Sequence, residues 1–205
     1  MHTTDNTTNV IDEPADWHRT PCEVTDWLVV SGDLPSNRAD AEALLERWIS
    51  LGITDIIDVR EEWNDAELVA ELAPDLRYHH LGTHDDGGWQ EDHWFDAGLA
   101  AIREVRARGG RAIVHCHMGV NRAPSMAFRM LLDAGHAPTE ALAMLRTARP
   151  IARILYAEAA VSHHLRAQGV DHDDAVAVRR EVNQWLLDNR VDTLWIISRI
   201  RRAEG

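Results

Sequence analysis

Short apolar runs alternate with amphipathic stretches along most of the chain. The runs are rich in β-branched residues and predict strands; they lie at Trp27–Ser31, Ile53–Val59, Leu76–Leu81 and Arg111–His115. Between them, apolar positions at helical spacing predict helices at Ala39–Ser50, Asp65–Leu72 and His93–Arg108. This alternation is typical of an α/β domain with a central, mostly parallel sheet flanked by helices on both faces.

The chain becomes helical after the last predicted strand. Helices are predicted at Ala123–Ala134, Pro138–Thr147 and Ile154–Gln168, and the first is apolar nearly all round, which favours a central position. Two more, Asp173–Asp188 and Asp192–Arg202, would form a helical C-terminal extension over residues 169–205. Its candidate buried positions are Trp185, Leu186, Leu194, Trp195, Ile197 and Ile200. Residues 17–168 form the main domain in this division, and residues 1–16 lack hydrophobic periodicity and predict a disordered tail.

Composition narrows the classes of function. The formal net charge of -13 argues against broad binding to nucleic acid or to an anionic membrane, since like charges repel. No apolar stretch approaches the length of a membrane span, and the N-terminus resembles no secretory signal, so a cytoplasmic location is expected. Two cysteines, Cys22 and Cys116, are too few for a disulfide framework.

The candidate chemistry lies in residues 115–125, HCHMGVNRAPS, between a predicted strand and a predicted helix. Cys116 and Arg122 bracket five residues, and such a loop can direct backbone N–H groups, a helix N-terminus and a planar guanidinium at a phosphate. Gly119 supplies the backbone freedom for the curl. The candidate phosphate-binding residues are His117, Met118, Gly119, Val120, Asn121 and Arg122.

Cys116 is the candidate nucleophile of this loop. The same donors would stabilise its thiolate and lower the thiol pKa from its ordinary value of about 8.5. His115, at the end of the strand, is a supporting residue that can hold the loop or favour the thiolate. A lone cysteine is more often an inert buried thiol, and it is the spacing to Gly119 and Arg122 that favours the functional interpretation.

The string resembles the HC-x2-G-x2-R signature of dual-specificity, protein-tyrosine-phosphatase-like cysteine phosphatases, matching at His115, Cys116, Gly119 and Arg122. The similarity extends over roughly Val24–Gln168 and includes LVVSGDLP, LGITDIIDV and TEALAMLRTARPIARI. The resemblance implies the cysteine phosphatase fold and hydrolysis of a phosphate monoester through a cysteinyl-phosphate. It also implies a phosphorylated substrate, either a phosphoprotein or a small phosphomonoester, and no metal or cofactor.

The family also uses an aspartic acid in a loop ahead of the amphipathic helix. Residues 84–88, HDDGG, occupy that place; Asp85 is the predicted general acid and Asp86 the alternative, and either can instead serve turn chemistry beside the glycines. By this resemblance Cys116 attacks phosphorus while Asp85 protonates the leaving oxygen, and Asp85 then activates water.

One position departs from the family pattern. Ser or Thr usually follows the arginine, whereas this chain has Ala123, and loss of a hydroxyl donor predicts a slow second step, a more basic Cys116 or a phosphate-binding pseudophosphatase. A second alternative is a rhodanese-like sulfurtransferase, suggested by the string Asp58–Glu61 (DVRE), although rhodanese loops typically have one residue fewer. The C-terminal helices are expected to pack on the domain or to form a homodimer contact.

Overall fold

The computed structural model describes residues 17–204, and its centre is a five-stranded sheet. The spatial order is β1-β2-β5-β3-β4, in which β1 is antiparallel to β2 and the other neighbours are parallel. The strands are β1 (Cys22–Glu23), β2 (Leu28–Ser31), β3 (Asp55–Arg60), β4 (Arg77–Thr83) and β5 (Ala112–His115). The predicted mostly parallel sheet is confirmed, and only the short β1 was not predicted.

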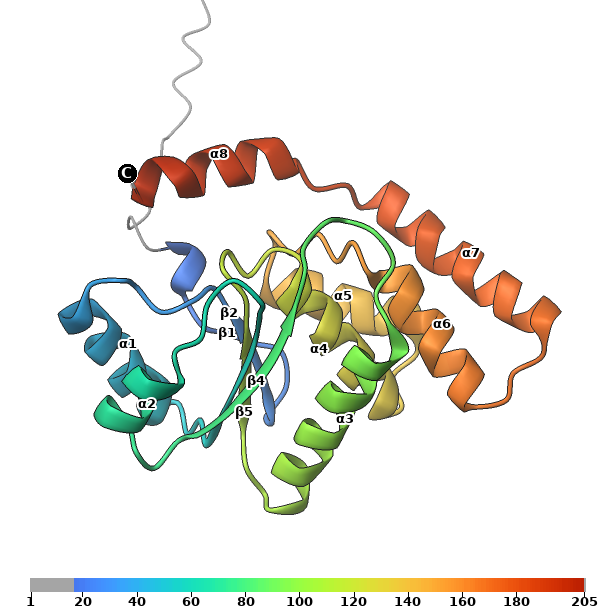
Figure 1. Ribbon diagram of the computed structural model, residues 1–205. Helices are drawn as coiled ribbons and strands as arrows, with labels where there is room; N and C mark the ends of the chain where they lie inside the picture. Colours follow the sequence, from blue (N-terminus) through green and yellow to red (C-terminus); the bar gives the residue numbers. More distant parts are fainter. Residues whose placement is uncertain (1–16, 205) are drawn as a thin grey trace, which may run out of the picture.

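Helices cover both faces of the sheet (Figure 1). They are α1 (Arg38–Ser50), α2 (Ala66–Leu72), α3 (Asp92–Ala107), α4 (Arg122–Asp133), α5 (Pro138–Ala148), α6 (Ala157–Ala167), α7 (His172–Asp188) and α8 (Thr193–Glu204). A short 3-10 helix, Trp17–Arg19, precedes β1. The predicted central helix is confirmed in α4, where every residue from Arg122 to Leu132 is buried.

Side chains alternate between the two faces along each strand, as a period of two requires. Val29, Ile56 and Ile113 pack under α1 and α2, whereas their neighbours Val30, Ile57 and Val114 pack against α3, α4 and α6. Both faces are therefore buried, which is why the strands read as continuous apolar runs. β5 lies in the middle of the sheet, and the loop that follows it opens at the carboxyl ends of the parallel strands, where α/β sheets bind ligands.

The C-terminal helices pack on the domain. Helix α7 contacts α5 and α6, and α8 crosses the end of the sheet at which β5 terminates (Figure 1). The prediction that Leu194 and Trp195 are buried is wrong, since they are 82% and 50% exposed. The prediction that Ile200 is buried is confirmed, and Ile196, which was not predicted, is buried with it, because the face of α8 that they share lies against Val120 of the loop after β5. Of the helices within residues 17–204, none combines the length and the apolar character needed to span a bilayer.

Candidate active site

Residues 116–122, here called the phosphate loop, connect β5 to α4, and Cys116 is buried at their base. Gly119 has a φ of 62°, and a Cβ built there would lie 2.5 Å from the carbonyl oxygen of Ser31. A side chain is thus excluded on two grounds, backbone conformation and space. Within residues 17–204, the N–H groups of residues 117–121 donate to no protein oxygen, which leaves them available to an anion.

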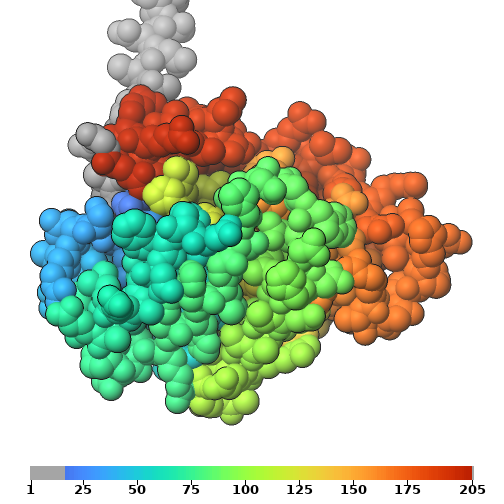
Figure 2. Space-filling view, in the orientation of Figure 1, coloured from blue at the N-terminus to red at the C-terminus, as the bar shows by residue number. Residues whose placement is uncertain are grey.

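The side chains of the phosphate loop point in different directions. Val120 is buried and Met118 half-buried against α8, so these two predicted phosphate-binding residues can offer only their backbone. His117 remains partly exposed beside the loop, and Asn121 is buried toward the segment that contains Asp85. In the space-filling view the loop forms a yellow patch in a hollow between α8 in red and the teal and green segments that follow β3 and β4 (Figure 2).

Arg149 supports the phosphate loop from below. It is 2% exposed, and its Nε donates to the Gly119 carbonyl at 2.5 Å while Nη2 donates to the carbonyls of Met118 and His18 at 3.0 and 2.7 Å. The guanidinium of Arg149 thus binds two carbonyls of the phosphate loop and the carbonyl of His18, and it fixes the loop without using the loop N–H groups. Sequence reasoning assigned no role to Arg149, although the arginine–proline pair that ends α5 marked the position.

One edge of the Arg122 guanidinium makes no hydrogen bond within residues 17–204, although Asp85 Oδ2 lies 3.3 Å from its Nε. Glu62 accepts from Nη1 and Nη2, both at 2.6 Å, and the carbonyl of Thr83 accepts from Nη1 at 3.0 Å. Of the five N–H donors, this leaves one on Nη2 and the one on Nε, and Nε is buried without a hydrogen-bond acceptor. These two donors lie on one edge, which is the fork that binds a phosphate in bidentate fashion.

Glu62 was missed by the sequence analysis. Glu62 directly follows the DVRE string. Its partner Arg122 lies 60 residues further along the chain, a separation that no local sequence pattern reveals. The hydrogen bond with Arg122 lowers the pKa of Glu62 to about 2, so the carboxylate stays ionised and holds the guanidinium in place.

The thiol of Cys116 is subject to opposing influences. Burial raises its pKa, while the charge of Arg122 and the N–H groups of Ala123 and Gly119 lower it, and the net direction is upward. The prediction of a lowered pKa from the loop donors is therefore wrong, whereas the upward direction agrees with the more basic Cys116 predicted from Ala123. Because Glu62 neutralises part of the Arg122 charge, the loop favours the thiolate less than its donors alone suggest.

The two candidate acids occupy different places. Asp85 reaches the phosphate loop, where its Oδ1 accepts from Asn121 Nδ2 at 2.6 Å and its Oδ2 lies 3.3 Å from Arg122 Nε. Asp86 accepts from the N–H of Gly88 at 2.8 Å, which is turn chemistry within its own loop. The geometry brings Asp85 together with Arg122, and Asp86 remains a turn residue.

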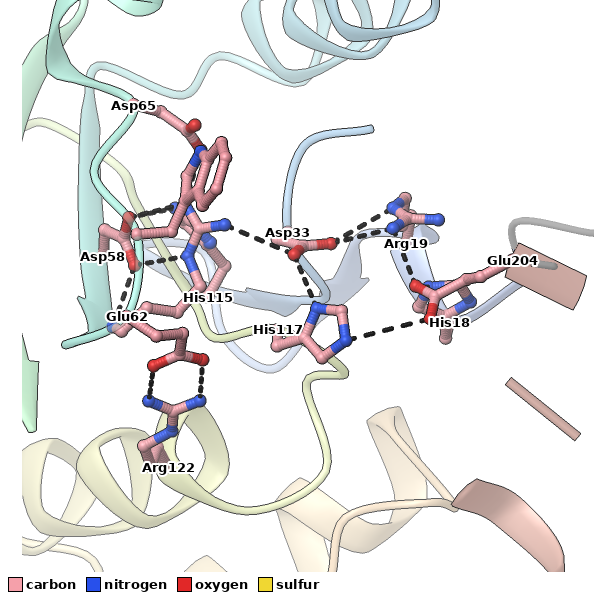
Figure 3. A network of polar contacts seen from close by, with 12 residues as sticks. His18, Arg19, Asp33, Asp58, Glu62, Asp65, His115, His117, Arg122 and Glu204 are labelled. Atoms are coloured by element: carbon pink, nitrogen blue, oxygen red, sulfur yellow. Dashed lines mark hydrogen bonds and ion pairs between the residues drawn. The ribbon is translucent and has the colours of Figure 1, made fainter. Parts of the chain in front are cut away.

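A buried ionic network lies beside the phosphate loop (Figure 3). Arg60 bridges Asp58 at 2.7 Å and Asp33 at 3.3 Å and also pairs with Asp65, and Asp33 bonds His117 Nδ1 at 2.8 Å. Asp58 and Arg60 thus pair with each other at the end of β3. Asp58 and Arg60 of the DVRE string therefore have a structural role in these ion pairs at the carboxyl end of β3.

His115, predicted as a supporting residue, is fully buried under the loop. Its ring lies 5.7 Å from that of Trp48, Asp58 Oδ2 is 3.9 Å away, and neither ring nitrogen has a hydrogen-bond partner within residues 17–204. Burial lowers the pKa of His115, so the ring is neutral and acts by packing.

Within residues 17–204, two groups of side chains have the composition of metal ligands: Asp58 with Asp65 and His115, and His18 with Asp33 and Glu204. Each already pairs with an arginine guanidinium, Arg60 in the first group and Arg19 in the second. In both groups an arginine already pairs with the carboxylates, so these carboxylates are not free to coordinate a metal ion.

The contact between α8 and the phosphate loop is expected to depend on pH. The hydrogen bond with Asp33 raises the pKa of His117 above 6.5, and the charge of Glu204 in α8, 3.8 Å from Nε2, raises it further. Burial and the charge of Arg19 lower this pKa, and the net direction is upward. A raised pKa stabilises the folded state below about 6.5, and this stability disappears as the pH rises through the folded-state value. Urea unfolding at pH 6 and pH 9 should show a larger midpoint difference between wild type and His117→Gln at pH 6. An equal difference at both values would contradict the assignment.

The fold is an α/β sheet in which a cysteine loop connects the central strand to a buried helix. Residues 38–156, more than half of the chain, match the dual specificity phosphatase catalytic domain. The chain belongs to this family, and it is a phosphatase of the dual-specificity type by family and fold. No curated protein matches the chain.

Solved structures share the fold at low sequence identity. The crystal structure of PTPMT1 aligns with a TM-score of 0.62 and 19% identity, over 73% of this chain and 97% of that one. Human DUSP28 aligns with a TM-score of 0.60 and 19% identity, over 72% and 95%. The human tyrosine phosphatase-like serine/threonine/tyrosine-interacting protein aligns with a TM-score of 0.57 and 18% identity, over 74% and 97%.

Proposed function

We propose that this chain is a catalytically active hydrolase of phosphate monoesters that works through a cysteinyl-phosphate. The observation that carries the proposal is the edge of Arg122 whose buried Nε has no hydrogen-bond acceptor within residues 17–204, beside loop N–H groups that donate to no protein oxygen in the same part of the chain. Buried donors without partners are costly, and a phosphate would satisfy them together.

The first chemical step uses groups that the fold brings together. The thiolate of Cys116 attacks phosphorus, the S–P bond forms, and the bond from phosphorus to the leaving oxygen breaks as Asp85 donates its proton to that oxygen. Arg122 and the loop N–H groups stabilise the charge that develops on the equatorial oxygens.

The second step releases phosphate. The Asp85 carboxylate takes a proton from water, the water oxygen bonds to phosphorus, and the S–P bond breaks to restore the thiolate. The proton that Asp85 gives to the leaving oxygen is thus replaced from water, and the thiolate of Cys116 is restored.

The test is hydrolysis of p-nitrophenyl phosphate by the full chain in EDTA, followed by stopped-flow absorbance. Steady turnover with a burst of p-nitrophenol stoichiometric with protein supports an active enzyme that accumulates cysteinyl-phosphate. Absence of both turnover and burst, together with calorimetric binding of inorganic phosphate, would overturn it in favour of a phosphate-binding pseudophosphatase, the alternative that Ala123 favours.

Ala123→Ser tests the consequence of the missing hydroxyl. Ala123 is fully buried, and its N–H, like that of Gly119, lowers the pKa of Cys116, so a serine hydroxyl at this position adds a further donor to the thiolate. We expect steady-state turnover to rise about tenfold relative to the burst rate, and alkylation by iodoacetamide at pH 7 to accelerate. An unchanged ratio of burst to steady state in a variant with wild-type melting temperature would contradict this role.

The sulfurtransferase alternative loses its support. It depended on the DVRE string, and the side chains of Asp58 and Arg60 pair with each other within the buried network.

A further inference from the structure

Asp85 holds its carboxylate in an asymmetric environment. Its Oδ1 accepts two hydrogen bonds, from Asn121 Nδ2 at 2.6 Å and from the Tyr156 hydroxyl at 2.9 Å. Its Oδ2 accepts no hydrogen bond within residues 17–204 and lies 3.3 Å from Arg122 Nε, beside the free edge of the guanidinium. The two oxygens of this carboxyl group therefore have different chemical capacities.

The orientation of the Asn121 amide is determined by its neighbours. Its Oδ1 accepts from the N–H of Leu155 at 2.7 Å and from the Ser125 hydroxyl at 3.4 Å. Since a backbone N–H can only donate, the oxygen must face Leu155, and Nδ2 must therefore face Asp85. Ser125 thus contacts Asn121 and not the thiol.

Tyr156 is equally constrained. It is 1% exposed, its ring meets that of Trp94 edge to face at 6.3 Å, and its hydroxyl oxygen accepts from the N–H of Gly87 at 3.2 Å. Burial raises the pKa of Tyr156, so the hydroxyl keeps its proton. Two acceptors face this proton, Asp85 Oδ1 at 2.9 Å and the His84 carbonyl at 3.4 Å, and the shorter distance favours Asp85.

The backbone that brings these donors into place is strained. Ile154 has a φ of 55°, in the left-handed region, and it is the only residue other than glycine with a positive φ among residues 17–204. A β-branched residue rarely adopts this conformation. Strain of this kind persists where the surroundings enforce it, and it clusters at functional sites. Here it ends the connection before α6, which begins at Ala157 and not at the predicted Ile154, and it directs Leu155 and Tyr156 at the loop.

We propose that Asn121 and Tyr156 are positioning residues, which occupy Oδ1 of Asp85 so that Oδ2 transfers the proton to the leaving oxygen. An oxygen that accepts two hydrogen bonds has no lone pair free for a proton, so the acidic proton resides on Oδ2. Oδ2–H then breaks as the leaving oxygen gains its hydrogen, and Oδ1 keeps its two donors throughout. The inference rests on the proposed function and adds the two residues that orient its acid.

The test compares leaving groups. Protonation by the acid matters little for p-nitrophenyl phosphate, whose leaving group is weakly basic, and much for phenyl phosphate, whose leaving group is more basic. We expect Tyr156→Phe to lower kcat for phenyl phosphate by about tenfold and for p-nitrophenyl phosphate by about twofold, with KM nearly unchanged. Asp85→Asn should show the same selectivity to a greater degree.

Two further variants separate positioning from folding. Asn121→Asp keeps an oxygen for the Leu155 N–H but removes the donor to Asp85, so it should reproduce the selective loss. Tyr78→Phe is the matched control, since the other tyrosine of the chain bonds Asp58 and Asp65 and leaves Asp85 untouched, so its ratio of the two substrates should equal that of wild type.

The outcomes distinguish the two proposals. If wild type hydrolyses neither substrate, the proposed function itself fails. If wild type is active and Tyr156→Phe and Asn121→Asp lower kcat for both substrates by the same factor, the proposed hydrolysis stands and the positioning role is overturned.

Discussion

Cys116→Ser is expected to lower hydrolysis of p-nitrophenyl phosphate by about 10⁴-fold or more, since enzymes that lose their nucleophile fall by factors of this order. A serine hydroxyl at the base of the loop is far weaker as a nucleophile than a thiolate. The loop donors and Arg122 are unchanged, so binding of inorganic phosphate should persist within a few-fold. The measurement is kcat/KM in EDTA together with calorimetry of phosphate binding.

Cys22→Ser is the matched control for this variant. Cys22 lies in β1, and its sulfur contacts the Thr20 carbonyl and Arg149 Nη1, both at 3.4 Å, on the far side of the arginine that supports the loop. We expect activity within about threefold of wild type, since Cys22 is half-buried and its replacement by serine changes only one atom. If Cys116→Ser keeps more than about a hundredth of wild-type activity, Cys116 is not the nucleophile.

Arg122→Lys is expected to lower kcat/KM by about 10³-fold, because a point charge replaces the planar fork that the free Nε and Nη2 donors form. The change also leaves Glu62 without its bidentate partner, so the ammonium would be drawn toward Glu62 and away from phosphate. Calorimetry should show weaker binding of inorganic phosphate, in contrast to Cys116→Ser.

Arg103→Lys provides the comparison, since Arg103 also forms a bidentate pair, with Asp133 on the exposed side of α3 and α4. Its kcat/KM should equal that of wild type. If Arg122→Lys retains more than a tenth of wild-type kcat/KM, the free edge of the guanidinium is not the phosphate site.

The sequence by itself determined the α/β fold and the position of the phosphate loop. Buried strands such as β5 contain short apolar runs, and helical spacing identified α3 and α4, because local periodicity follows directly from which faces are buried. Cys116, Gly119 and Arg122 lie within one short loop, so their spacing was visible in the chain.

Only the tertiary structure decided which groups complete the site. Glu62, Arg149 and Tyr156 reach the loop or its acid from other elements, across 60, 30 and 71 residues of the chain. Contacts between residues so far apart leave no periodic signal in a sequence. The choice between Asp85 and Asp86 was likewise open, because adjacent residues in a loop point in directions that the surrounding packing selects.

The direction of the Cys116 pKa and the buried face of α8 were also decided in three dimensions. A cysteine in such a loop predicts a stabilised thiolate, whereas the depth of burial and the neutralising effect of Glu62 depend on packing. Helix α8 buries Ile196 and Ile200 and exposes Leu194 and Trp195, because the apolar side chains it meets, Val120 and Met118, belong to the phosphate loop. The amphipathic pattern identified a helix, and the surface against which it packs selected the buried face.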